Sequence, residues 1–275
     1  MISALRRGAL TALALGVALP AAAEPPARVV SMNLCTDQIA LMLAAPGQLI
    51  SVSRLAVDPL SSSMAAEAAA YPPNRGQAEQ IFLMKPDLVL ASTYSSISSV
   101  ALLRDLGVTV VQVEPVNALS QVEAQILTIG QALGRETQAE ALAAEFREGL
   151  KGLTWQGELA TAAMYYPNGY TSGAGSLADD VLRTAGFHNI GAELGLTGGG
   201  TLPLERLVMA QPDVIVTSTP YPGGSRSEEL LNHPALAELR QEAGLATTTD
   251  ADWVCGTPHI LRALRSMRDA REALE

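Results

Sequence analysis

Histidine, cysteine and aromatic residues are scarce in this chain of 275 residues. Three His and two Cys are too few for a thiolate zinc site, and few for a site that holds a free ion through imidazoles. Lys and Arg number 18 against 28 Asp and Glu, and a formal net charge of −10 repels the phosphates of nucleic acids. We therefore expect no nucleic-acid partner and no metal site formed by protein side chains.

The first 23 residues have the features of an export signal. Arg6 and Arg7 precede the apolar run GALTALALGVAL, and small residues follow before Glu24. That run is shorter than the roughly 20 residues that a membrane-spanning helix needs. The sequence predicts a cleaved signal peptide over 1–23 and a soluble protein in the periplasm, where disulfides persist.

Strands and helices alternate in two stretches of the chain, and this order is typical of parallel α/β sheets. It predicts an N-terminal α/β lobe over 24–118 and a C-terminal α/β lobe over 154–275. In the first lobe we expect strands at 27–32, 49–52, 88–91 and 108–113, with helices at 36–45 (capped by Thr36 or Asp37), 78–84 and 100–106. In the second lobe we expect strands at 159–166, 213–218 and 246–249, with helices at 177–185, 204–210, 235–242 and 258–273.

Residues 119–153 break this alternation, because they contain no candidate strand. The stretch is rich in Ala, Glu and Leu, with apolar residues three and four positions apart, which predicts two helices. The second should run from about Glu136 to Lys151. A long helix between two α/β lobes is a rigid connector, unlike a Gly/Ser linker.

An internal repeat relates the two lobes. Residues 79–93 (EQIFLMKPDLVLAST) match residues 205–219 (ERLVMAQPDVIVTST) at one offset, with Glu, Pro, Asp, Ser and Thr in the same places. A matched helix–turn–strand unit in each half favours two related lobes with a ligand cleft between them. Glu79 and Glu205 begin equivalent helices. Their carboxylates either complement the helix dipoles or form a two-point docking surface for a basic partner.

The few aromatic residues gather where strands are predicted to end. Such side chains offer flat apolar walls with a polar tip, which suits a bulky, partly apolar ligand. We therefore predict a ligand-binding site that contains Tyr94, Tyr166, Tyr170, Tyr221 and Trp253, together with Cys35, Arg54 and His259. Trp155 should lie away from the cleft.

The two cysteines fall on predicted strand-to-helix loops, one in each lobe, and several interpretations stay open. Cys35 and Cys255 could be buried thiols, a disulfide that ties the lobes at the cleft, or, with His259, soft ligands of a cofactor metal. Alternatively, Cys255 and His259, four positions apart at a helix start, could serve an exported thiol-dependent enzyme.

With these features, the sequence resembles the substrate-binding proteins of ABC importers, in the subclass with two lobes joined by a rigid helix. The resemblance covers Arg28 to Leu274, and the helix-to-strand PD[LV] block in both lobes is its most specific mark. It also rests on Val29-Val30-Ser31, Thr36-Asp37, the helix 136–153 and the run TSGAGSLADDVLRTAGFHN over 171–189.

The resemblance implies two Rossmann-like α/β lobes with a ligand cleft between them, and a protein without catalytic residues. The subclass carries cobalamin, ferric siderophores and haem, and the loop Asp252–His259 looks most like that of the cobalamin-binding members. The implied ligand is a metal chelate, ordered as corrinoid, ferric siderophore and then haem, so no further cofactor is expected. The implied partners are an inner-membrane ABC permease and its ATPase, which Glu79 and Glu205 would contact. We expect a monomer. A periplasmic sensor domain remains an alternative.

Overall fold

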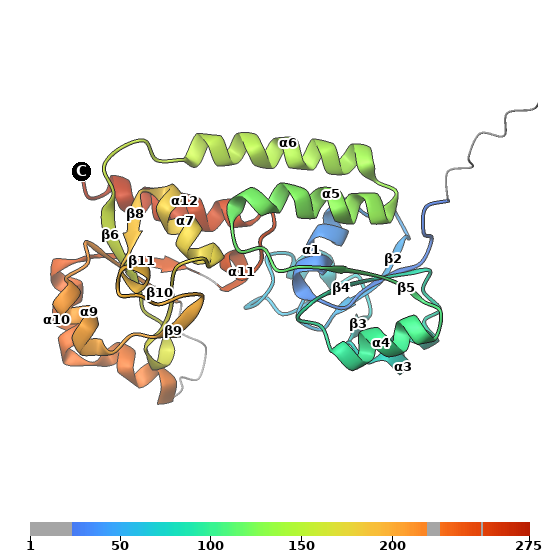
Figure 1. The fold of residues 1–275 in the computed structure, drawn as a ribbon, viewed down its shortest axis with the longest axis horizontal. Coiled ribbons are helices and arrows are strands. Elements are labelled where there is room, and N and C mark those ends of the chain that lie inside the picture. Colours follow the sequence, from blue (N-terminus) through green and yellow to red (C-terminus); the bar gives the residue numbers. More distant parts are fainter. Residues whose placement is uncertain (1–23, 219–225, 249) are drawn as a thin grey trace, which may run out of the picture.

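Two α/β lobes lie side by side along the long axis of the molecule, and two connecting helices lie along one side of it (Figure 1). The computed structural model describes residues 24–218, 226–248 and 250–275. The predicted signal peptide, 1–23, is outside these residues. Within the described part, no helix is both long and apolar enough to cross a lipid bilayer.

The N-terminal lobe is built on a parallel sheet of five strands in the order β3-β2-β1-β4-β5. Its strands are β1 (Val29–Ser31), β2 (Leu49–Ser53), β3 (Pro73–Asn74), β4 (Leu88–Ser92) and β5 (Thr109–Val113). Its helices are α1 (Leu34–Leu43), α2 (Ala65–Ala68), α3 (Ala78–Leu83) and α4 (Ile97–Asp105). Alternate residues of β1 and β4 bury against opposite faces. Val29 packs in the core that contains α1, whereas Val30 packs in the core that contains α3 and α4.

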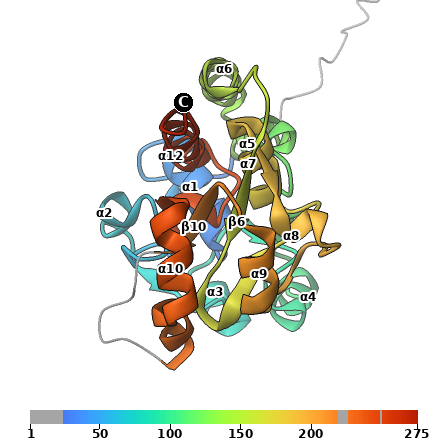
Figure 2. The same ribbon diagram turned by 90° about the vertical axis from the view of Figure 1, so that its left-hand side faces the viewer.

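The C-terminal lobe repeats this layering with a parallel sheet in the order β11-β10-β6-β8. Its strands are β6 (Ala160–Met164), β8 (Phe187–Asn189), β10 (Val214–Ser218) and β11 (Gly244–Thr248). Helices α7 (Leu177–Ala185) and α12 (Ile260–Glu272) cover one face, and α9 (Leu204–Ala210) and α10 (Pro234–Glu242) cover the other (Figure 2). Shorter helical segments are η2 (Pro167–Gly169), α8 (Ile190–Glu193), η3 (Arg226–Asn232) and α11 (Asp250–Trp253).

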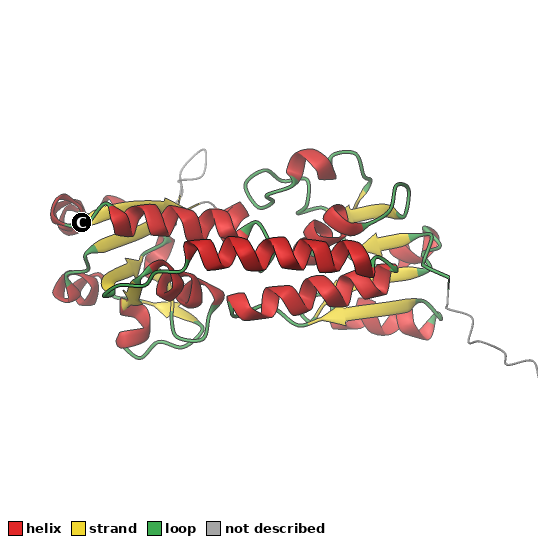
Figure 3. Cartoon of the chain, turned by 90° about the horizontal axis from the view of Figure 1, so that it is seen from above, coloured by secondary structure: helices red, strands yellow, loops and turns green. Residues whose placement is uncertain are grey.

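The connector consists of the short turn η1 (Leu119–Gln121) and the helices α5 (Val122–Leu133) and α6 (Glu136–Leu153). Gly134, at φ 66°, ends α5 in a left-handed cap. Gly130 lets α5 and α6 approach closely, because a Cβ there would collide with Ala139. Seen from above, α6 extends across both lobes (Figure 3). One continuous apolar core contains residues of both sheets and of both connector helices.

The structure gives a physical reason for the repeated Pro-Asp pair. The carboxylate of Asp87 accepts hydrogen bonds from the backbone N–H groups of Ala27 and Arg28, at 2.9 Å each, just before β1. In the other lobe, Asp213 accepts from the backbone N–H and the hydroxyl of Thr161, at 2.7 Å each, at the start of β6. Each aspartate thus anchors the beginning of the neighbouring strand, and the Thr161 donors hold the pKa of Asp213 below its usual range.

The predicted class of two α/β lobes with a cleft is confirmed, and most predicted elements lie within a few residues of the observed ones. The sequence pattern did not predict the antiparallel ribbon of β7 (Tyr170–Ser172) and β9 (Gly199–Thr201). It also missed β3 and β8. These strands have only two or three residues, which is too short for an alternating pattern to stand out.

Candidate functional site

A pocket of about 890 Å³ lies between the two lobes. Its walls come from the carboxyl ends of β4 and β5, the N-terminal turns of α1 and α7, the β7–β9 ribbon and the loop after α11. These are the places where ligands bind in open α/β folds, because the ends of parallel strands meet at one edge of the sheet. The volume lies in the upper part of the usual range for small-molecule sites.

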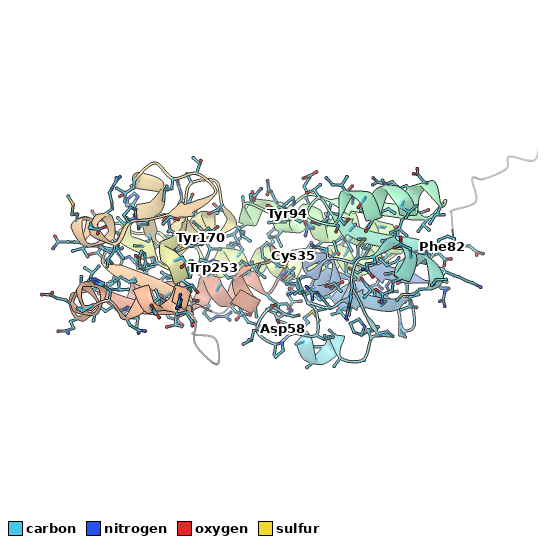
Figure 4. The ribbon with its side chains drawn as sticks, turned by 90° about the horizontal axis from the view of Figure 1, so that it is seen from below. Cys35, Asp58, Phe82, Tyr94, Tyr170 and Trp253 are labelled. Carbon is cyan, nitrogen blue, oxygen red and sulfur yellow. A yellow bond between two sulfur atoms is a disulfide. The ribbon has the colours of Figure 1, made fainter. Side chains whose placement is uncertain are left out.

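Aromatic side chains from both lobes line this pocket. Tyr94 follows β4 in the N-terminal lobe and is 82 % exposed, while Tyr166, Tyr170 and Trp253 come from the C-terminal lobe. Viewed from below, Tyr94 lies on the side of the N-terminal lobe, opposite Tyr170 and Trp253, with Cys35 near the middle (Figure 4). The fifth predicted aromatic, Tyr221, falls within 219–225 and lies outside the described residues.

Two of these aromatics are positioned by elements that differ from those predicted. Tyr170 does not end a strand but begins β7, where its ring packs so closely on β9 that a Cβ at Gly199 would collide with it. Trp253 does not follow the last strand directly, because it ends the short helix α11, which comes after β11. Both placements depend on short elements that carry little pattern of their own.

The N-terminus of α1 also differs from the prediction. The helix begins at Leu34, and Asn33 caps it by accepting a hydrogen bond from the backbone N–H of Cys35 at 3.0 Å. Thr36 is not the cap, because its hydroxyl pairs with that of Ser31 at 2.7 Å. Cys35 therefore lies in the first helical turn rather than in a loop.

Asp37, the other predicted cap, has a different role. Its carboxylate is fully buried and accepts hydrogen bonds from the backbone N–H and the hydroxyl of Ser53, at the end of β2. Burial raises the pKa of Asp37 from 3.8 to about 6, although the Ser31 and Ser53 hydrogen bonds oppose this rise. The side chain thus joins α1 to the sheet beneath one wall of the pocket.

A disulfide joins Cys35 to Cys255 across 220 positions of sequence, with a Cα–Cα distance of 5.2 Å. It links the first turn of α1 in the N-terminal lobe to the loop between α11 and α12 in the C-terminal lobe. Cys35 lines the pocket, whereas Cys255 is buried. Because the bond uses both cysteines of the chain, neither a thiolate nucleophile nor thiolate metal ligation is available in this state.

The structure does not bring two of the predicted ligand-binding residues to the pocket. Arg54 is exposed beyond β2 and is not among the lining residues. His259 also lies outside the lining, with its Nδ1 2.8 Å from the guanidinium of Arg262. Burial and, next, the Arg262 charge lower the pKa of His259, so it is neutral at pH 7. No cluster of three or more His, Cys, Asp or Glu side chains that could hold a metal ion occurs among the described residues.

Several lining residues were not predicted. Glu114 and Val116 follow β5, and Ser176 caps α7 by accepting from the backbone N–H of Asp179 at 3.1 Å. The position of Glu114, directly after the predicted strand 108–113, is a signal that could have found it, since neighbouring strand ends line the same edge. The approach of Val116 to Gly256, where a Cβ would collide, could not be read from sequence.

Glu79 and Glu205 are not among the residues that line the pocket, and they lie at matching places in the two lobes. Each is an exposed carboxylate in the first turn of its helix, α3 or α9. Both helices end in a turn with a residue at positive φ, Lys85 at 50° and Gln211 at 44°. The sequence repeat is therefore also a structural repeat.

Two α/β lobes, a helical connector and a large aromatic-lined pocket between the lobes define a two-lobed ligand-capture protein. Residues 29–243 match the family described as periplasmic binding protein. The chain belongs to this family, whose members bind solutes outside the cytoplasm.

Individual proteins are similar to this chain in sequence or in fold. A cobalamin-binding protein of Halobacterium salinarum is 28 % identical over 198 residues, which cover 70 % of this chain and 54 % of that protein, so the chain spans about half of its length. The periplasmic heme-binding protein RhuT of Roseiflexus sp. RS-1 has a similar fold, with a TM-score of 0.74, 23 % identity and coverage of 88 % and 98 % of the two chains. The vitamin B12 binding protein BtuF of Vibrio cholerae also has a similar fold, with a TM-score of 0.68 and 20 % identity. The match covers 90 % of this chain and 98 % of that protein.

Proposed function

We propose that this protein captures a corrinoid in the periplasm and delivers it to an inner-membrane ABC permease. The observation that carries the proposal is the pocket of about 890 Å³, with Tyr94 on one lobe and Tyr166, Tyr170 and Trp253 on the other. Aromatic faces on opposite walls suit a large, flat macrocycle, because they bury much apolar surface and lose little conformational entropy.

The order of ligands is corrinoid, then ferric siderophore, then haem. The cobalamin-binding relative supports a corrinoid, while the haem-binding and B12-binding neighbours share the fold alone. The ligand brings its own metal, so the protein needs no separate cofactor. Its role is to bind and release the chelate unchanged.

Delivery requires a surface that a membrane partner can contact, and Glu79 and Glu205 supply a matched acidic pair for it. Both carboxylates are exposed, and the lobes present them from equivalent helices. A permease with two basic pockets would meet one glutamate of each lobe, and its ATPase would then drive import. We propose that the protein acts as a monomer after its signal peptide is removed.

A titration of tryptophan fluorescence tests the ligand assignment. Cyanocobalamin, cobinamide, a ferric hydroxamate, a ferric catecholate and haemin are each added to the purified protein. We expect quenching at submicromolar corrinoid and weaker or no response to the others. Tight binding of haemin or of a siderophore, with no response to either corrinoid, would overturn the corrinoid assignment.

A further inference from the structure

Glu114 is the one charged residue among the described residues that line the pocket. It directly follows β5, and Ser92 of β4 pairs with Val113 of β5, so Glu114 lies beside Thr93 at the end of the sheet. The hydroxyl of Thr93 donates a hydrogen bond to Glu114 Oε2 at 3.1 Å. The carboxylate is therefore held at the pocket wall by the residue that follows the neighbouring strand β4.

The helix ends that face the pocket do not offset this negative charge. Helices α1 and α7 both point their N-termini at the pocket, and such ends favour anions. However, each first turn carries its own acidic residues, Asp37 in α1 and Asp179 and Asp180 in α7. The Asn33 and Ser176 caps also occupy backbone N–H groups there.

We infer that Glu114 selects the ligand by charge, an inference that rests on the proposed function. The pocket favours corrinoids with a positive net charge and rejects chelates that carry carboxylates or other anionic groups. Glu114 is exposed in the protein without ligand, and a bound macrocycle that covers it would displace water and lower the local dielectric constant, which strengthens the effect of its charge. The overall charge of −10 adds to the same field. An anionic ligand such as haemin would place its carboxylates against this field, which costs binding energy.

Two corrinoids that differ only in the axial ligand of cobalt make a sharp test. Cyanocobalamin is neutral, whereas aquacobalamin carries a positive charge at neutral pH, where Asp37 is also mostly ionised. The wild type should bind aquacobalamin more tightly than cyanocobalamin. Glu114→Gln keeps the size of the side chain and removes its charge, so the ratio of the two affinities should fall by about three- to tenfold.

Glu140→Gln is the matched control, since Glu140 is an exposed glutamate on α6 that does not line the pocket. It should leave the ratio unchanged. Thr93→Val removes the hydrogen bond to Glu114 but keeps the charge, so most of the preference should persist. Glu114→Lys should raise the affinity for haemin relative to cyanocobalamin.

An unchanged ratio in Glu114→Gln, with both corrinoids still bound, would overturn the inference and leave the proposed function intact. Wild-type protein that binds neither corrinoid would overturn the proposed function, and the inference with it. Circular dichroism of each variant verifies that a lost preference does not come from unfolding.

Discussion

The hydroxyl of Thr257 donates a hydrogen bond to the side-chain oxygen of Gln38 at 2.9 Å, although the two residues are 219 positions apart. Both are fully buried. Gln38 lies one turn along α1 from Cys35, so this bond and the Cys35–Cys255 disulfide hold one segment of the C-terminal lobe on one helix of the N-terminal lobe. Val116 packs against Gly256, which lies between Cys255 and Thr257 in the sequence. The lobes are therefore joined at the pocket as well as through α5 and α6.

Removal of the disulfide should destabilise the protein. In the Cys35→Ser/Cys255→Ser variant, the unfolded chain regains the freedom that a link across 220 positions removes, and we expect a loss of about 2–5 kcal/mol. Urea unfolding measures the effect. Wild type in reductant should unfold at the midpoint of the double variant, and equal midpoints for oxidised wild type and variant would contradict the prediction.

The double connection should limit the movement of the lobes. Hinge closure needs a few residues that absorb changes in backbone dihedral angles, and a helical connector packed into the common core does not offer them. Small-angle scattering should show nearly the same radius of gyration with and without cyanocobalamin. A large compaction on addition of the ligand would contradict the prediction. The Cys35→Ser/Cys255→Ser variant separates the contribution of the disulfide from that of the helices.

The pocket aromatics should account for much of the affinity. Tyr94→Ala and Tyr170→Ala should each weaken cyanocobalamin binding by about ten- to hundredfold, because aromatic side chains that become covered on binding contribute much of the binding energy. Tyr71→Ala is a suitable control, since Tyr71 packs on the core of the N-terminal lobe and does not line the pocket. Titration calorimetry measures all three, and equal losses in all three would contradict a role specific to the pocket.

Trp253 should report ligand binding, whereas Trp155 should not. Trp155 lies outside the lining residues, and the guanidinium groups of Arg268 and Arg271 stack on its ring at 4.7 and 4.3 Å. Trp253→Phe should therefore abolish most ligand-induced quenching and leave the Trp155 emission. Quenching that survives in Trp253→Phe and disappears in Trp155→Phe would contradict the placement of Trp253 in the ligand-binding site.

Asp37 should make stability depend on pH. Its pKa is about 6 in the folded state against 3.8 as the ordinary value, so the folded state holds the proton more tightly. The favourable contribution is fully present below pH 3.8 and is lost as the pH rises through 6, with a total of about 3 kcal/mol. Asp37→Asn cannot ionise, so the difference in unfolding free energy between wild type and variant should change over this window. A difference that stays constant from pH 4 to pH 7 would contradict the raised pKa.

Charge reversal of Glu79 and Glu205 together should reduce transport and spare ligand affinity. The two glutamates lie outside the pocket lining, so their loss affects only the proposed contact with the permease. Uptake of labelled cyanocobalamin by whole cells and titration of the purified variant give the two measurements. Glu140→Lys/Glu136→Lys on α6 is the matched control for the change of charge. A loss of affinity in the Glu79/Glu205 variant would show that the docking assignment is wrong.

The amino-acid pattern alone predicts the order of the longer strands and helices, the two lobes, the helical connector and the repeated Glu and Pro-Asp positions. These features depend on local hydrophobic periodicity and on turn residues such as Pro86 and Gly134, which act over a few positions. The tertiary structure alone decided that Cys35 meets Cys255, that Asn33 caps α1, that Glu114 lines the pocket and that Arg54 and His259 do not. Such contacts depend on strand order, twist and packing between residues as far as 220 positions apart. They cannot be predicted from a pattern that extends over only a few neighbouring residues.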